Sequence, residues 1–224
     1  MKKVRNQAPS ERTVIRQTPD RASYEMETIC GIIDQSVIAT VAISVDNEPF
    51  VLPMAIARIE DKVYLHGLKT SRLMKHLRSG AEVCICITHL DGIVVARSGM
   101  HCSANYRSVV IHGRGSEIVG AEKADLLYKV VHSIIPGSEG DYREHLGKEL
   151  KATSLFAIPL DESVCKIRTG GPVDDEEDLQ LPYWAGVVPV HHTYGKPVPS
   201  DDLAEGIETP DYATHYERPG TVAQ

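Results

Sequence analysis

A dense group of polar side chains lies between residues 98 and 115, in the stretch SGMHCSANYRSVVIHGRG. The group comprises His101, Ser103, Asn105, Tyr106, Arg107 and Ser108. Because an imidazole titrates near neutrality, His101 is a candidate proton donor, with Tyr106 as a second candidate catalytic residue. The alternative is that His101 only hydrogen-bonds its own loop. The alternating apolar run that follows predicts a strand, so we expect this cluster at the rim of a sheet, where a ligand can bind.

A second candidate site is the start of a predicted helix at residues 68–80, LKTSRLMKHLRSG. Thr70 or Ser71 is expected to cap this helix. Its first turn also carries Lys69 and Arg72, and a helix N-terminus offers free N–H groups to an anion. Two interpretations stay open, a phosphate site or a capped helix with solvated cations, because no glycine-rich phosphate motif accompanies it.

Short apolar runs separated by turn signals predict antiparallel β-structure. The expected strands are residues 37–45, 50–57, 62–67, 82–88, 92–98, 108–119, 153–160 and 163–168. Residues 82–88 and 92–98 are expected to form a hairpin across Leu90-Asp91-Gly92. Pro53 lacks an N–H donor, which predicts a bulge or a sheet edge. Helices are expected from a cap at Asp20 to Asp34, over 68–80 and over 122–135. The fold class is therefore mainly β, a closed antiparallel barrel with peripheral helices.

Composition narrows the function classes. The net charge of −7 does not favour nucleic-acid binding, and no run is long and apolar enough to predict a membrane span. The N-terminus also lacks the apolar core of a signal peptide, so a cytoplasmic location is expected. The scattered, odd set of five cysteines favours buried structural thiols over a metal site or a disulfide. No metal site is predicted, because no ligand spacing repeats. We expect a basic arm at residues 1–13, a barrel at 14–170 and an acidic, proline-rich extension at 171–224 that packs on the barrel or on a partner.

Several motifs together carry a family resemblance. These are PFVLPMAIA, KVYLHGLKTSRLMKHL, HCSANYRSVVIHGRG and the late segment KIRTGGPVDDEEDLQLPYWAGVVP. They resemble the pyridoxamine 5'-phosphate oxidase-like, FMN-binding split-barrel family, closest to its flavin-nucleotide-binding branch with the Nim-type nitroimidazole reductases. The resemblance spans roughly residues 14–200. It implies a six-stranded split barrel and a homodimer with FMN in clefts at the subunit interface.

The resemblance also implies a set of flavin-binding residues. Leu52, Pro53 and Met54 would contact the isoalloxazine, and His66 and Gly67 precede the phosphate site. Ser71 and Arg72 match the phosphate binders, and Lys69 or Lys75 would replace the second basic residue of the family, since Leu73 stands at its position. Ser103, Asn105, Arg107 and Ser108 would line the cleft. Lys166, Arg168 and Trp184 would come from the partner subunit.

The oxidase of this family also carries a late Arg-x-His motif that grips the substrate phosphate. The sole counterpart here is Arg143-Glu144-His145, which lies upstream of the last strands and argues against pyridoxamine phosphate as the substrate.

Two classes of function follow from these observations. The first is an FMN-dependent oxidoreductase or reductase that acts on a small molecule, with NADH or NADPH as a possible electron donor. The second is a non-catalytic module for flavin storage or sensing, or for haem with His66 or His101 as the axial ligand. Reduction of the bound flavin, or a Soret band after haem addition, distinguishes the two.

Overall fold

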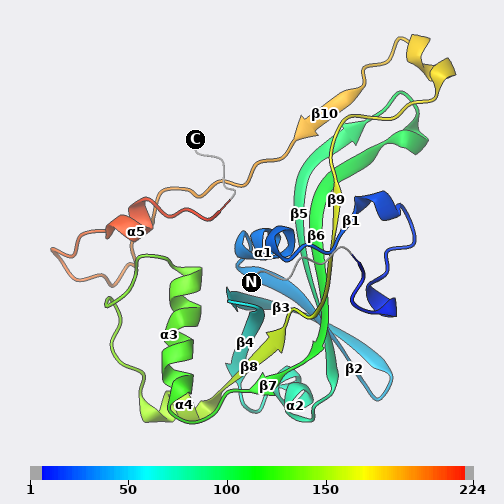
Figure 1. The fold of residues 1–224 in the computed structure, drawn as a ribbon. Coiled ribbons are helices and arrows are strands. Elements are labelled where there is room, and N and C mark those ends of the chain that lie inside the picture. The colour runs from blue at the N-terminus through cyan, green and yellow to red at the C-terminus, as the bar shows by residue number, and fades with distance from the viewer. Residues whose placement is uncertain (1–6, 220–224) are drawn as a thin grey trace.

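One strongly bent antiparallel sheet organises the protein (Figure 1). The computed structural model describes residues 7–219. The strands are β1 (Ala22–Ser23), β2 (Ile38–Val45), β3 (Glu48–Ile59), β4 (Lys62–Leu68), β5 (Glu82–Val95), β6 (Ser103–Arg114), β7 (Ser116–Glu117), β8 (Thr153–Pro159), β9 (Glu162–Arg168) and β10 (Gly186–Pro189). They are ordered β1-β9-β6-β5-β2-β3-β4-β8-β7, and β10 pairs with β5. The mainly β class and the split-barrel fold are confirmed, with more strands than the six expected.

Within residues 7–219, five α-helices accompany the sheet. They are α1 (Met26–Asp34), α2 (Arg72–Arg78), α3 (Glu122–Ile134), α4 (Gly147–Ala152) and α5 (Asp211–Thr214). The first helix begins at Met26 rather than near Asp20, which instead lies in a short 3-10 turn, Pro19–Arg21. No helix within residues 7–219 is long and apolar enough to cross a membrane.

The core lies inside the bend of the sheet. Alternate residues of the central strands, such as Val41, Ile85 and Ile111, are fully buried there, as the two-residue period of a strand requires. Helices α1 and α2 cover opposite ends of this core (Figure 1). A second, smaller core forms where α3 packs on the other face of β4 and β8.

Strand β5 corrects one prediction. Residues 82–88 and 92–98 do not form a hairpin, because β5 runs through the Leu90-Asp91-Gly92 signal as one strand with a bulge at Asp91. The Asp91 carboxylate accepts two hydrogen bonds from Arg107 on the neighbouring strand, at 2.7 and 2.9 Å. A β-bulge leaves one residue unpaired and sharpens the twist. The chain turns after β5 instead, so β5 and β6 extend beyond the barrel as a long arm (Figure 1).

Pro53 lies at a sheet edge and not in a bulge. The pairing of β3 with β2 is continuous through Thr40 and Pro53. On its other side β3 pairs with β4 only over Ile56–Ile59. The missing N–H of proline therefore breaks no ladder hydrogen bond.

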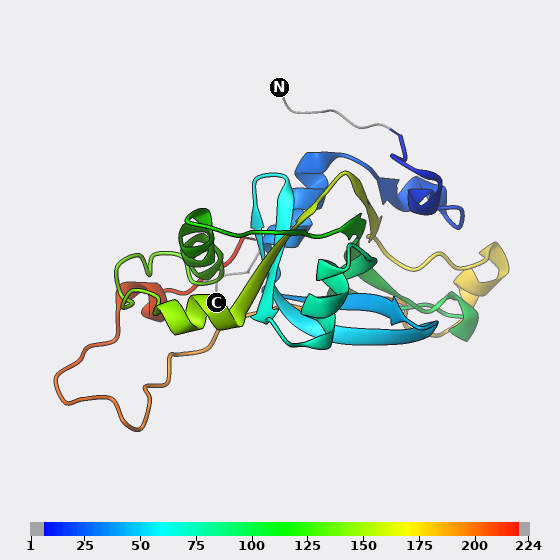
Figure 2. The same ribbon diagram turned by 90° about the horizontal axis from the view of Figure 1, so that it is seen from below.

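The ends of the chain are fastened to this frame. The predicted basic arm begins outside the described residues, and within them Arg12 forms ion pairs with Glu82 and Glu162. The C-terminal extension adds β10 to the arm, loops away from the barrel and returns to it (Figure 2). It is held there by Arg218, which is 7% exposed.

Candidate functional site

The start of α2 forms one corner of the barrel, with Arg72 as the first residue of the helix. Ser71 caps the helix, since its hydroxyl accepts the N–H of Met74 at 3.3 Å. The guanidinium of Arg72 lies 3.9 Å from the centre of the Phe50 ring, a cation–π contact that orients it. Lys69, three residues before Arg72, is exposed, and its charge acts on Glu117 and Lys123. Arg72 and the capped helix start make this corner suited to a phosphate.

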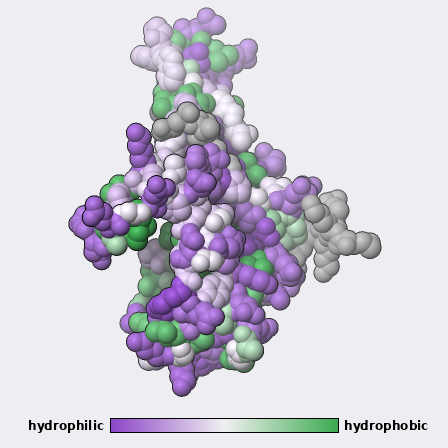
Figure 3. Space-filling view, turned by 90° about the vertical axis from the view of Figure 1, so that its left-hand side faces the viewer, coloured by the Kyte–Doolittle hydropathy of each residue, from purple (hydrophilic) through white to green (hydrophobic). Residues whose placement is uncertain are grey.

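The outer face of the sheet carries small, uncharged side chains. One row across the strands contains Pro53, Thr40, Cys86 and Val110, all of them at least partly exposed. The short side chains of this row would let a planar ring approach the strands closely. The opposite side, which carries α3, is mainly hydrophilic, and its apolar side chains occur in small separate groups (Figure 3).

Strand β6 divides the polar cluster between two faces. The cluster lies largely inside this strand and not ahead of it, because β6 begins at Ser103. Side chains alternate along a strand, so Tyr106 and Ser108 share the outer face, whereas Asn105 and Arg107 lie on the other. Arg107 is held by Asp91 there and also donates to Gln35.

The late basic residues lie beside β6 on strand β9. Ser108 pairs with Lys166 and donates to its carbonyl at 3.3 Å. Arg168 is buried and donates to the side-chain oxygen of Asn105. The amide nitrogen of Asn105 in turn donates to the carbonyl of Gly170 at 3.0 Å. These bonds hold the base of the arm together.

His101 and Trp184 lie farther out on the arm. The imidazole Nδ1 of His101 lies 2.6 Å from the carbonyl oxygen of Val173, and Nε2 lies 3.6 Å from Asp175. One nitrogen of His101 is thus engaged in joining two segments of the arm. The indole of Trp184 is 64% exposed and packs so closely on Gly186 that a Cβ there would lie 2.8 Å from it.

The two groups of candidate residues are separated within one chain. The corner of α2 contacts β3, and Ser108 lies on β6, with β2 and β5 between these strands. Three strand spacings of about 4.8 Å separate the two strands by about 14 Å along the sheet. Lys166 lies one strand farther.

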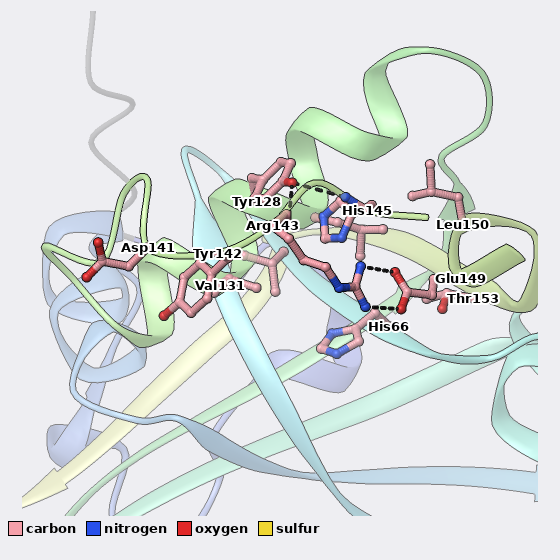
Figure 4. A pocket seen from close by; sticks show the side chains of 12 residues that line it. His66, Tyr128, Val131, Asp141, Tyr142, Arg143, His145, Glu149, Leu150 and Thr153 are labelled. Carbon is pink, nitrogen blue, oxygen red and sulfur yellow. Dashed lines mark hydrogen bonds and ion pairs between the residues drawn. The ribbon is translucent and has the colours of Figure 1, made fainter. Parts of the chain in front are cut away.

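A pocket of about 640 Å³ opens on the other face of β4, under α3 and α4 (Figure 4). Its size is in the range of small-molecule sites. Leu127, Val130, Val131 and Leu150 provide apolar walls. His66 points into it from β4 and His145 from the loop before α4 (Figure 4). His66 therefore faces away from the α2 corner, because it alternates with the buried Leu65.

Each of these two histidines has a buried nitrogen without a hydrogen-bond partner in residues 7–219. The atoms are Nδ1 of His66 and Nε2 of His145. Burial lowers the pKa of His66, which keeps the imidazole neutral. The ring of His145 stacks on Tyr128 at 4.1 Å between centroids, and the Tyr128 hydroxyl accepts the backbone N–H of His145 at 3.1 Å. A neutral, buried and unpaired imidazole nitrogen is suited to ligate a metal.

Arg143 and Glu149 form an ion pair on the wall of this pocket (Figure 4). Their closest atoms are 2.6 Å apart, and a second hydrogen bond measures 3.0 Å. Glu149 also accepts the N–H of Leu146 at the start of α4, at 2.8 Å. The Arg143 guanidinium and this N–H together lower the pKa of Glu149 to about 2.

Comparisons with known proteins identify the family. The family model for pyridoxamine 5'-phosphate oxidase matches residues 25–167, more than half of the chain. The chain belongs to the pyridoxamine 5'-phosphate oxidase family. No curated protein matches the chain in sequence.

Solved structures extend this likeness over most of the chain. Flavocytochrome Anf3 from Azotobacter vinelandii shares 36% identity and a TM-score of 0.88, over 92% of this chain and 97% of that one. The FAD and haem binding protein from Mycobacterium smegmatis shares 34% identity and a TM-score of 0.83, over 86% and 95%. A 5-nitroimidazole resistance protein from Bacteroides thetaiotaomicron has the same fold, with 20% identity, a TM-score of 0.52 and coverage of 65% and 86%.

The residues expected to bind flavin in this member of the pyridoxamine 5'-phosphate oxidase family lie on different faces of the sheet. Leu52 and Met54 are half-buried against the core, and Pro53 is on the outer face. Gly67 is close to Met74 of α2, whose methyl carbon would lie 3.4 Å from an added Cβ. The roles predicted for these residues stay predictions.

Sequence reasoning missed the pocket around His66. Tyr128, Arg143 and His145 were not expected to form a site, although the Arg143-Glu144-His145 motif was visible. The signal is weak because Tyr128 belongs to a helix and the other two to an irregular loop, so only the packing of α3 over β4 joins them.

Proposed function

We propose that the protein binds a flavin, FMN or FAD, in a cleft completed by a second copy of the chain, and acts as an oxidoreductase on a small molecule. The observation that carries this proposal is the separation of the candidate residues. The α2 corner and the Ser108–Lys166 pair lie at least three strands apart in one subunit. A two-fold dimer packed through the outer sheet face would bring the α2 corner of one subunit near the arm of the other.

The two similar flavoproteins support this assignment. One is a flavocytochrome and the other binds FAD and haem, and both share more than a third of their aligned residues with this chain. A bound flavin would supply hydride or electron transfer.

The chain's own residues would bind and orient this flavin. Lys69 and Arg72 would neutralise the phosphate, and the small side chains around Thr40 would let the ring lie against the sheet. Tyr106 and Ser108, on the same face, would contact the ring or the substrate. His101, already bonded to Val173, would hold the arm in place.

Absorbance titration tests the flavin site. Addition of FMN or FAD to the purified protein should give a bound-flavin spectrum, and light scattering should give a mass about twice 24.6 kDa. Arg72→Ala should weaken flavin binding about tenfold, the value of one charge-assisted contact. Lys129→Ala, an exposed cation on α3, should leave it unchanged. The proposal would be contradicted if the protein bound neither FMN nor FAD. It would also be contradicted if a monomer bound one flavin per chain. Reduction of the bound flavin by NADH or NADPH tests the oxidoreductase role.

Haem in the His66 pocket is a second candidate function. The buried, unpaired Nδ1 of His66 favours it, as do the neutral state of the ring and the apolar walls. The residues fit the group: His66 or His145 can ligate the iron, and the walls can cover the porphyrin. His101 fits less well, because its Nδ1 is engaged on the exposed arm. A bound haem would supply one-electron chemistry.

A Soret titration separates the histidines. Wild-type protein should bind added hemin with a Soret shift, His66→Ala should lose or alter that spectrum, and His101→Ala should retain it. Loss of the band in His101→Ala alone would contradict this placement.

A further inference from the structure

An ion pair between Arg143 and Glu149 forms the polar end of the His66 pocket. Arg143 bonds Glu149 with two of its nitrogens, and one of these also donates to the carbonyl of Glu144 at 2.9 Å. The side chain of Arg143 is 64% exposed and that of Glu149 is 39% exposed. An ion pair this exposed is worth little, so an incoming anion can compete for Arg143.

Loss of Arg143 would leave Glu149 with a separate role. Its carboxylate still accepts the N–H of Leu146 and so caps the start of α4. The wall of the pocket would therefore stay folded when Arg143 changes partner. If Arg143 bound another anion, the protein would lose only the solvent-exposed ion pair between Arg143 and Glu149.

The charged residues of the wall favour one orientation of a ligand in the pocket. Asp141 and Arg143 lie at different parts of the wall, Asp141 beside Tyr142 and Arg143 beside His66 and Glu149 (Figure 4). Among the described lining residues Arg143 is the one that carries a permanent positive charge. An acidic group on a ligand is thus attracted to the Arg143 end and repelled from the Asp141 end.

We propose that the pocket selects a flat, largely apolar ligand with a carboxylate at its edge. Arg143 releases Glu149 and binds the ligand carboxylate in its place. The inference rests on the haem site proposed above and specifies how this chain recognises the porphyrin. The apolar walls would pack against the porphyrin ring, His66 would ligate the iron, and Arg143 would form an ion pair with a propionate. A guanidinium is suited to this exchange, because its planar fork binds any carboxylate with two parallel hydrogen bonds.

The test compares hemin with hemin dimethyl ester, in which both edge carboxylates are neutral methyl esters, each titrated by the Soret band. Wild-type protein should bind hemin about tenfold more tightly than the ester, the effect of one charge-assisted contact. Arg143→Gln should lose this preference by weakening hemin alone. Glu149→Gln should bind hemin more tightly than wild type, because Arg143 is released while the amide oxygen still caps α4.

Lys148→Gln is the matched control, since Lys148 is an exposed cation on the same helix that does not line the pocket. It should leave both affinities unchanged. Equal binding of the two probes by wild type, or equal weakening of both in Arg143→Gln, would overturn the exchange while leaving the haem site in place. Absence of a Soret shift with either probe would overturn the haem proposal and this inference with it.

Discussion

Replacement of Arg218 by alanine should destabilise the protein by about 3 kcal/mol, because this side chain joins the C-terminal ends of two helices. Its guanidinium donates to the carbonyls of Ser133 in α3 at 2.8 Å and of Asp34 in α1 at 2.7 Å. Longer contacts of 3.4 and 3.3 Å reach Ile134 and Ser36. The last carbonyls of a helix have no partner within it and carry partial negative charge, so a buried cation stabilises both ends at once.

The magnitude follows from the two short bonds. A hydrogen bond to a charged group contributes about 1.5–3 kcal/mol. Two of them give about 3 kcal/mol at the lower bound, which is appropriate because water can reach the carbonyls once the side chain is gone. For a chain of this size 3 kcal/mol corresponds to a fall in Tm of roughly 6–12 °C.

Urea denaturation followed by circular dichroism measures this loss. The protein concentration is held constant, because association would add its own stability. Arg218→Lys is the control: one ammonium can serve one helix end, so about half of the loss should remain. A change below 1 kcal/mol for Arg218→Ala would refute the reasoning and show that the C-terminal segment does not stabilise the barrel.

Three further predictions test other parts of the structure. Ser71→Ala should cost about 1 kcal/mol of stability by removing the cap of α2, whereas Ser71→Thr should restore most of it; an unchanged urea midpoint in the alanine variant would contradict this. Gly92→Ala should displace β10, because the new Cβ would lie 2.9 Å from Val187; faster amide exchange at Val188 checks this, and unchanged protection would argue against it. His66 has a lowered folded-state pKa, so the unfolded state binds its proton more tightly. Stability should therefore be complete above about pH 6.5 and fall as the pH drops below it, and His66→Gln should remove part of that slope in pH-dependent unfolding.

Local features of the fold were predictable because they depend on short-range patterns. The cap at Ser71, the end of α1 at Asp34 and the helix over residues 122–134 follow from side chains a few positions apart. The same local reasoning failed at Leu90-Asp91-Gly92. A turn signal there was outweighed by a long-range contact, since Arg107 holds the Asp91 carboxylate and β6 pairs with both halves of β5.

The candidate flavin residues were predictable in type but not in arrangement. Their motifs indicate the family and the fold, and they predict Arg72, Ser108 and Lys166 as candidate binding residues. Only the order of the strands decides that Arg72 lies far from the other two within one chain, because pairing order depends on contacts distant in sequence.

The sequence by itself determined the class of fold, the strands and helices, and the family, because hydrophobic periodicity, capping residues and conspicuous motifs are local. The tertiary structure decided which of the candidate residues lie together. It separated Arg107 from Ser108 across one strand, engaged His101 in the arm, and placed His66 with Arg143 and His145 in a pocket under α3. Such sites depend on which faces of the sheet are covered by helices, and no local pattern encodes that choice.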